Sequence, residues 1–117
     1  MKYLTHLILF LFLGITSIFA QNNPNWLRYS AISPDGQTIV FTFKGDLYSV
    51  PSAGGIAHAL TFHPAYDYMP VWSHDGKSIA FTRGGQIWQC GLDGSNEKQL
   101  TNIYTGASDF EWSKDGK

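Results

Sequence analysis

The strongest constraint on the fold of this chain is an internal repeat with a period of 40 residues. The string Ser-x-Asp-Gly occurs at residues 33–36, 73–76 and 113–116, each copy 40 residues after the one before it. Overlaying residues 33–72 on residues 73–112 without a gap pairs eleven identical residues, most of them turn residues or apolar strand positions. A fixed period near 40 is typical of propellers, in which each repeat is a blade of four strands.

The residues within each repeat agree with that architecture, because four short β-branched or aromatic segments alternate with turn residues about every ten positions. The first repeat predicts strands at 28–32, 38–43, 46–50 and 56–60, and the second at 67–72, 78–83, 86–90 and 97–100. The three hairpin turns of a blade are predicted at Ser-x-Asp-Gly, then at Lys44-Gly45 and Gly84-Gly85, then at Gly54-Gly55 and Asp93-Gly94.

These segments predict an all-β fold, a truncated β-propeller with two complete blades and the start of a third. Blade one covers about residues 26–61, blade two about 66–101, and the third blade begins at 107–117. Closing a propeller ring takes about four to eight blades, because both faces of every blade must be covered. We therefore expect the remaining strands to follow Lys117 in a longer parent protein.

The amino terminus predicts a secretory signal peptide over residues 1–20. Lys2 gives a positive start, residues 7–18 are almost entirely apolar, and Phe19-Ala20 provides a small-residue end before Gln21. The alternative is a membrane anchor, but a spanning helix needs about 20 apolar residues. This apolar run is shorter than that and is followed by the polar residues Asn22-Asn23-Pro24. We expect cleavage after Ala20, no stable membrane insertion afterwards, and a periplasmic or extracellular location in a Gram-negative bacterium.

Charge and cysteine usage exclude some function classes for the mature part. Without Lys2, residues 21–117 keep seven basic and nine acidic side chains, and no basic stripe that would recruit nucleic acid is present. Cys90 is the single cysteine, so no internal disulfide can form, and its strand position favours a small buried residue over a reactive thiol.

Catalytic motifs are absent: the sequence has no Gly-x-Ser-x-Gly elbow, no His-Glu-x-x-His zinc helix and no phosphate-binding glycine loop. His58 and His74 align with Lys98 and Lys114 of the next repeat and are interpreted as exposed positions. We therefore predict no catalytic, cofactor-binding or metal-binding residues in the chain.

Two weaker hypotheses stay open for side chains that could carry chemistry. His63 is four residues from Asp67, so a metal or acid–base pair is conceivable, although loop residues of this kind are usually solvated or structural. The aspartates of the repeated turns, Asp35, Asp75 and Asp115, could in principle bind calcium. Each turn offers a single carboxylate, however, and a calcium loop needs several oxygen ligands, so a turn-stabilising role is favoured.

The connection at residues 63–70, His-Pro-Ala-Tyr-Asp-Tyr-Met-Pro, is the most unusual stretch. Two tyrosines between prolines predict a stiff aromatic element that packs between blades. The alternative is a peptide-binding patch at the mouth of the channel, since loops at propeller faces commonly carry binding.

Residues 26–36, 44–48 and 60–73 resemble the start of tricorn-protease-like peptidases secreted by Gram-negative bacteria, and residues 63–70 are the most specific part of the likeness. The likeness covers residues 25–82. The blades are also similar to the broader TolB-like propeller repeat. From residue 81 the pattern changes to a tight turn, and residues 93–101 are typical of TolB and of propellers in the prolyl-oligopeptidase family.

The resemblance implies that the chain is the propeller part of an exported serine peptidase. Such a propeller gates or binds peptide or protein substrates for a catalytic domain further along the parent protein, and none of that domain's residues lies in this chain. Two alternatives stay open: a TolB-like periplasmic scaffold that binds proteins without catalysis, and the propeller of a prolyl-oligopeptidase-family dipeptidyl peptidase.

Overall fold

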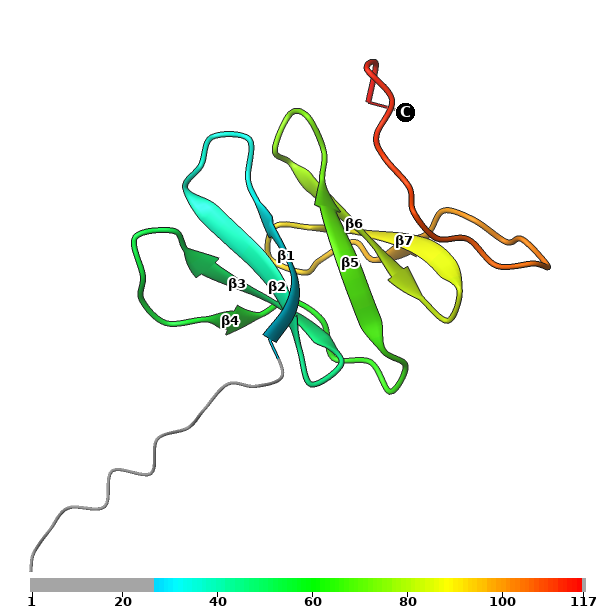
Figure 1. Ribbon diagram of the computed structural model, residues 1–117, viewed down its shortest axis with the longest axis horizontal. Coiled ribbons are helices and arrows are strands. Elements are labelled where there is room, and N and C mark those ends of the chain that lie inside the picture. Colours follow the sequence, from blue (N-terminus) through cyan, green and yellow to red (C-terminus); the bar gives the residue numbers. More distant parts are fainter. Residues whose placement is uncertain (1–26, 117) are drawn as a thin grey trace, which may run out of the picture.

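The computed structural model describes residues 27–116, and the predicted signal peptide, Trp26 and Lys117 lie outside the described residues. The described part contains eight strands and no helix. The strands form two antiparallel four-stranded sheets with orders β1-β2-β3-β4 and β5-β6-β7-β8 (Figure 1). Each sheet is one of the predicted blades, so the all-β propeller prediction is confirmed.

The observed strands follow the predicted segments closely. Blade one contains β1 (Leu27–Ile32), β2 (Thr38–Phe43), β3 (Asp46–Pro51) and β4 (His58–Ala59). Blade two contains β5 (Asp67–Trp72), β6 (Ser78–Arg83), β7 (Gln86–Gly91) and β8 (Lys98–Gln99). The outermost strands β4 and β8 are shorter than predicted. Neighbouring Ile56 is 78% exposed, so no packing extends the pairing there.

The predicted turns form as their residues require. The backbone N–H of Gly36 donates to the Ser33 carbonyl at 2.9 Å, and Gly76 makes the same 2.9 Å bond to Ser73. Lys44 and Gly45 both have positive φ, at 52° and 94°, as a two-residue turn between β2 and β3 requires.

The first strand of each blade contains a bulge that was not predicted from the sequence. Between Arg28 and Ala31 the register of β1 against β2 shifts, and β5 shifts in the same way against β6 between Tyr68 and Val71. Tyr29 (φ 51°) and Met69 (φ 56°), one repeat apart, lie in the left-handed region at these bulges. A bulge bends its strand and re-aims the neighbouring side chains.

The two blades stack face to face around one hydrophobic core. Blade one contributes Val40, Leu47 and Leu60 and blade two contributes Ile79, Phe81 and Cys90, with Trp72 and Trp88 packed against them. We call the face that a blade turns toward the next blade along the chain its forward face, and the opposite face its backward face. At this junction the forward face of blade one packs on the backward face of blade two. The indole N–H of Trp72 donates to the Ala31 carbonyl at 3.1 Å and so ties the two blades together.

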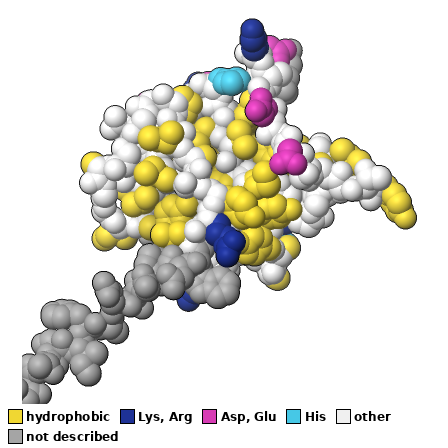
Figure 2. Space-filling view, viewed as in Figure 1, with side chains coloured by type: hydrophobic (Ala, Val, Ile, Leu, Met, Phe, Trp, Pro, Cys, Tyr) yellow, Lys and Arg dark blue, Asp and Glu magenta, His cyan; other side chains and the backbone are white. Residues whose placement is uncertain are grey.

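The first strands of the two blades lie at the narrow side of the stack. Strand β5 packs against β1, β2 and β3, whereas β4 and β8 do not touch each other. The blades therefore diverge from their first strands outward, as wedges around a ring axis do. Figure 2 shows hydrophobic side chains over both blades on the side turned to the viewer. In residues 27–116 no helix is long and apolar enough to cross a membrane.

Candidate functional site

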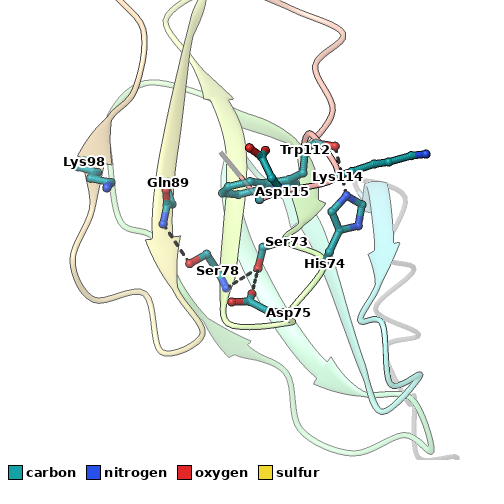
Figure 3. Close-up of a pocket in the computed structure, with 10 residues that line it drawn as sticks. Ser73, His74, Asp75, Ser78, Gln89, Lys98, Trp112, Lys114 and Asp115 are labelled. Atoms are coloured by element: carbon teal, nitrogen blue, oxygen red, sulfur yellow. Dashed lines mark hydrogen bonds between the residues drawn. The ribbon is translucent and has the colours of Figure 1, made fainter.

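A hollow of about 440 Å³ lies at the turn end of blade two (Figure 3). The turn that contains His74 and Asp75 lines this hollow together with the segment 112–116. Residues of the blade-two sheet complete the lining, namely Ser78, Gln89 and Lys98. The His74 ring reaches the Trp112 carbonyl, with its Nε2 3.2 Å from the oxygen. The side chain of Lys114 extends away from the hollow (Figure 3).

A smaller hollow of about 160 Å³ occupies the equivalent place one repeat earlier, where Ser33, Asp35, Thr38 and Trp72 line it. These residues are the repeat equivalents of Ser73, Asp75, Ser78 and Trp112. The smaller hollow is also lined by Pro34 and by Leu92 of the neighbouring blade. The large hollow is therefore an inter-blade crevice that recurs with the repeat, and its position does not by itself identify a binding site.

The repeated aspartates stabilise their own turns. Asp75 Oδ1 accepts hydrogen bonds from Ser73 Oγ at 2.7 Å and from the Lys77 backbone N–H at 3.0 Å. Asp35 is bound in the same way, by Ser33 and Gln37. These bonds, first the one from the serine hydroxyl, lower the pKa of both carboxyls below the ordinary value of 3.8. The turn-stabilising interpretation of Asp35 and Asp75 is thus supported by their contacts.

Asp115 is the aspartate of the third copy of the turn, and its Oδ1 accepts a hydrogen bond from Ser113 Oγ at 2.5 Å. Among the described residues, no three His, Cys, Asp or Glu side chains come together in a group that could hold a metal ion.

The structure separates His63 from Asp67, the pair that the sequence left as a weak hypothesis. His63 Nδ1 accepts a hydrogen bond from the Ala65 backbone N–H at 3.0 Å and lies in the exposed connection. Asp67 is fully buried at the start of β5, and its carboxylate is bound by Arg83. His58 lies exposed on β4, where it pairs with Ser49 in the sheet.

The ion pair of Asp67 with Arg83 is the main polar feature that the sequence did not reveal. Arg83 Nε and Nη2 donate to the two carboxylate oxygens of Asp67 at 2.6 Å and 2.7 Å, and Nη1 donates to Glu97 at 2.7 Å. The guanidinium also lies 5.1 Å and 4.9 Å from the ring centroids of Phe81 and Trp88. The hydrogen bonds that Arg83 donates to Asp67, followed by those that it donates to Glu97, outweigh the cost of burial and raise the pKa of Arg83.

This cluster ties segments of blade two together but has no feature of a reactive site. A guanidinium stays charged in proteins, so it cannot transfer a proton. In the first repeat its members are replaced by Leu27, Phe43 and Ala57. The ion cluster is therefore particular to blade two and does not recur with the repeat.

Cys90 also lies in the inter-blade core, as the sequence predicted for a small buried residue. It is 1% exposed, and burial raises the pKa of its thiol to about 12. Because the thiolate is the reactive form, burial disfavours a nucleophilic role for this cysteine.

The aromatic connection at 63–70 forms a packing cluster between the blades. Tyr68 lies 5.7 Å from Tyr29 of β1 and 5.6 Å from Tyr66, measured between ring centroids, with tilted rings. The Tyr66 ring covers Gly45, where an added Cβ would come within 3.2 Å of it. Tyr29 and Tyr66 remain 47% and 46% exposed. The cluster therefore joins the blades and also leaves aromatic surface beside the first strands.

The chain is similar in sequence to curated proteins and in structure to solved propellers. No protein-family model matches the chain. The chain is 30% identical over 101 residues to Dipeptidyl-peptidase 5 of Porphyromonas endodontalis and 31% identical over 103 residues to the protein Atu1656 of Agrobacterium fabrum. These matches cover 74% and 80% of the chain, but the chain spans only 15% and 34% of the two relatives.

Solved propellers share the arrangement of the strands. The crystal structure of TolB from Acinetobacter baumannii matches with a TM-score of 0.62 and 27% identity, over 78% of this chain and 25% of that one. The crystal structure of the tricorn protease matches with a TM-score of 0.62 and 19% identity, over 80% of this chain and 10% of that one. The described residues are thus two adjacent blades of a β-propeller of the kind found in TolB and in tricorn protease.

Proposed function

We propose that this chain is the propeller part of an exported serine peptidase, and that the propeller binds or gates peptide substrates for a catalytic domain elsewhere in the parent protein. The observation that carries the proposal is the 30% identity over 101 residues to a dipeptidyl peptidase. The tricorn-like arrangement of the blades supports it at the level of the fold.

The surface beside the ring axis suits a peptide ligand. Arg28 is exposed at the first strand of blade one, next to half-exposed Tyr29. Tyr66 extends the same aromatic cluster from the connection into blade two. Tyrosine rings offer apolar contact and a hydroxyl at low entropic cost, and the guanidinium of Arg28 can pair with a peptide carboxylate.

Activity-based labelling of the full-length parent protein tests the catalytic half of the proposal. We expect a fluorophosphonate probe to label one serine outside residues 1–117, and dipeptidyl p-nitroanilides or longer peptides to be hydrolysed. The labelled serine separates the two peptidase subclasses, because a Gly-x-Ser-x-Gly sequence around it indicates the prolyl-oligopeptidase type. A serine domain beside a PDZ module indicates the tricorn type. Neither labelling nor hydrolysis in a folded protein would contradict the proposal.

Substitution of Tyr29 by alanine tests the part assigned to the propeller. The Tyr29→Ala parent protein is expected to show a raised KM for peptides long enough to reach the propeller and an unchanged KM for a dipeptidyl substrate. Tyr104→Ala is the matched control, because Tyr104 is fully exposed on the connection after blade two. An equal effect of Tyr29→Ala on short and long substrates would show that the propeller does not contact the peptide.

A TolB-like scaffold that binds proteins without catalysis is the second candidate. It is favoured by the 27% identity to TolB of Acinetobacter baumannii. In this case the parent protein carries no serine that reacts with the probe. The labelling experiment therefore separates the two candidates directly.

Export is part of both candidates and rests on the predicted signal peptide. We expect the mature protein, isolated from the periplasm or the medium, to begin at Gln21. Amino-terminal sequencing of the mature protein measures this, and a chain that keeps residues 1–20 in the cytoplasm would contradict export.

A further inference from the structure

Residues 107–112 occupy the position of a first strand in a third blade, although no strand within residues 27–116 pairs with them. In Figure 1 this segment leaves the connection after blade two and rises beside it. Three observations show that it already has the geometry of β1 and β5.

The first observation is the contact at the start of the segment. The backbone N–H of Ala107 donates to the Gly85 carbonyl at 2.6 Å, and one repeat earlier the N–H of Asp67 donates to the Gly45 carbonyl at 2.8 Å. The same bond thus attaches the start of each segment to the second hairpin turn of the preceding blade.

The second observation is the contact at the end of the segment. Trp112 Nε1 donates to the Val71 carbonyl at 3.3 Å, as Trp72 Nε1 donates to the Ala31 carbonyl at 3.1 Å. The His74 ring adds a contact of 3.2 Å to the Trp112 carbonyl. Both ends of the segment are therefore held by blade two.

The third observation concerns the backbone between these ends. Asp109 has a φ of 52°, and the residues 40 and 80 positions earlier, Met69 and Tyr29, have φ of 56° and 51°. In β5 and β1 this residue forms the bulge against the second strand of the same blade. Residues 107–112 thus have the same left-handed conformation at the equivalent position, and no described strand pairs with them.

The approach to the segment is held as well. The Gln86 side chain donates to the Ile103 carbonyl at 2.8 Å, and its Oε1 accepts the Ile103 N–H at 3.0 Å. The connection between the blades is thus fixed to β7 before the segment begins.

We propose that each blade positions the first strand of the next blade through these contacts, independently of that blade's own sheet, so that every blade acts as a template for the one after it. The inference does not depend on the peptidase proposal, because it concerns only contacts between blades. A first strand that docks on the adjacent folded blade closes only a short loop. The chain therefore loses less entropy than it would in pairing segments that are distant in the sequence.

NMR on the purified chain tests the proposal through the {1H}-15N heteronuclear NOE of residues 107–112 and the exchange of the Trp112 indole N–H. We expect NOE values close to those of β5. We also expect indole exchange slower than that of a free indole by roughly tenfold or more, since only opening of the bond to Val71 exposes the proton. Values typical of a free chain end, with the Trp72 indole still protected, would overturn the proposal.

A pair of variants shows whether blade two holds the segment. Trp112→Ala is expected to lower the NOE of residues 107–112 while β5 to β7 keep theirs. Tyr104→Ala, a change of the fully exposed ring in the preceding connection, is expected to leave the NOE of the segment unchanged. If the segment stays ordered in Trp112→Ala, or if both variants release it equally, docking through Trp112 is wrong.

Discussion

Phe41 in blade one and Phe81 in blade two occupy the same position of the repeat, yet Phe81 is completely buried whereas Phe41 is only half-buried. Their strands have matching partners, since Phe41 pairs with Tyr48 and Phe81 with Trp88. The difference lies in the neighbour: the forward face of blade one covers Phe81, and no described residue provides such a face for Phe41. Local sequence therefore determines the sheet, and the adjacent blade determines the burial.

On the forward faces the difference in burial is reversed, because here the residue of blade one is the buried one. Leu60, on the forward face of blade one, is 6% exposed, whereas its repeat equivalent Leu100 is 44% exposed. The backward face of blade one is also hollow, with a groove of about 430 Å³ lined by residues that include Leu27, Ile39 and Phe41. Equivalent positions thus differ in exposure according to which face has a neighbour.

The largest expected effect comes from Arg83, which replaces the Phe43 of blade one. Arg83→Met leaves the buried carboxylate of Asp67 without its partner, and breaking a buried pair in this way costs about 3–5 kcal/mol. Phe43→Met is the matched control and removes no charge partner. Urea denaturation of both variants measures the difference, and equal stabilities would mean that the cluster is solvated.

The two phenylalanines test the burial argument itself. Truncation of a buried phenylalanine to alanine costs about 3–5 kcal/mol, and a half-buried ring is expected to lose roughly half of that. We therefore expect Phe81→Ala to destabilise the chain by about 2 kcal/mol more than Phe41→Ala. If the two variants unfold at the same urea concentration, blade one does not cover the backward face of blade two.

Glycines of the third turn give a smaller contrast. Gly54 and Gly94 both have positive φ, so alanine is strained at either position. A Cβ at Gly54 would meet nothing within 4 Å, whereas a Cβ at Gly94 would overlap the Leu60 carbonyl of blade one. Gly94→Ala is thus expected to cost at least about 1 kcal/mol more than Gly54→Ala. Thermal unfolding of both variants measures this difference. Equal decreases in Tm would show that a Cβ at Gly94 does not meet the Leu60 carbonyl.

The smallest expected effect is the pH dependence of stability that comes from the first-turn aspartates, which both blades have. Hydrogen bonds hold the folded-state pKa of Asp35 and Asp75 below 3.8. Their contribution to stability is therefore complete above the unfolded-state pKa and is lost as the pH falls through the folded-state pKa. Carbon-detected NMR titration of both carboxyls is expected to give depressed pKa values in each blade. An ordinary pKa at either aspartate would contradict the turn hydrogen bonds.

The sequence was sufficient for features that depend on local chemistry. The strands β2, β5 and β6 and the glycine turns agree with the prediction, because β-branched residues and glycines impose those conformations locally. The bulges could not be predicted, since Tyr29 and Met69 are not residue types that favour positive φ.

Contacts that join distant segments also escaped the sequence. Asp67 suggested a pairing with His63 four residues away, whereas the structure pairs it with Arg83, sixteen residues along the chain, across the β5–β6 sheet. The register of two strands decides that contact, and side-chain identities alone do not give it. The docking of Trp72 on Ala31 depends on the stacking of two sheets and was equally beyond local patterns.

Residue-resolved amide hydrogen exchange of the chain tests the central claim, that equivalent positions of the two blades differ in burial according to which face of each blade has a neighbour. Strands β2 and β6 have the same register with their partners, but β6 is buried at five of its six positions and β2 at two, so burial should separate their opening free energies. We predict slower exchange for the amides of Ile79 and Phe81 in β6 than for those of Ile39 and Phe41 in β2. Equal protection of the two strands, or slower exchange in β2, would contradict the stacked-blade account.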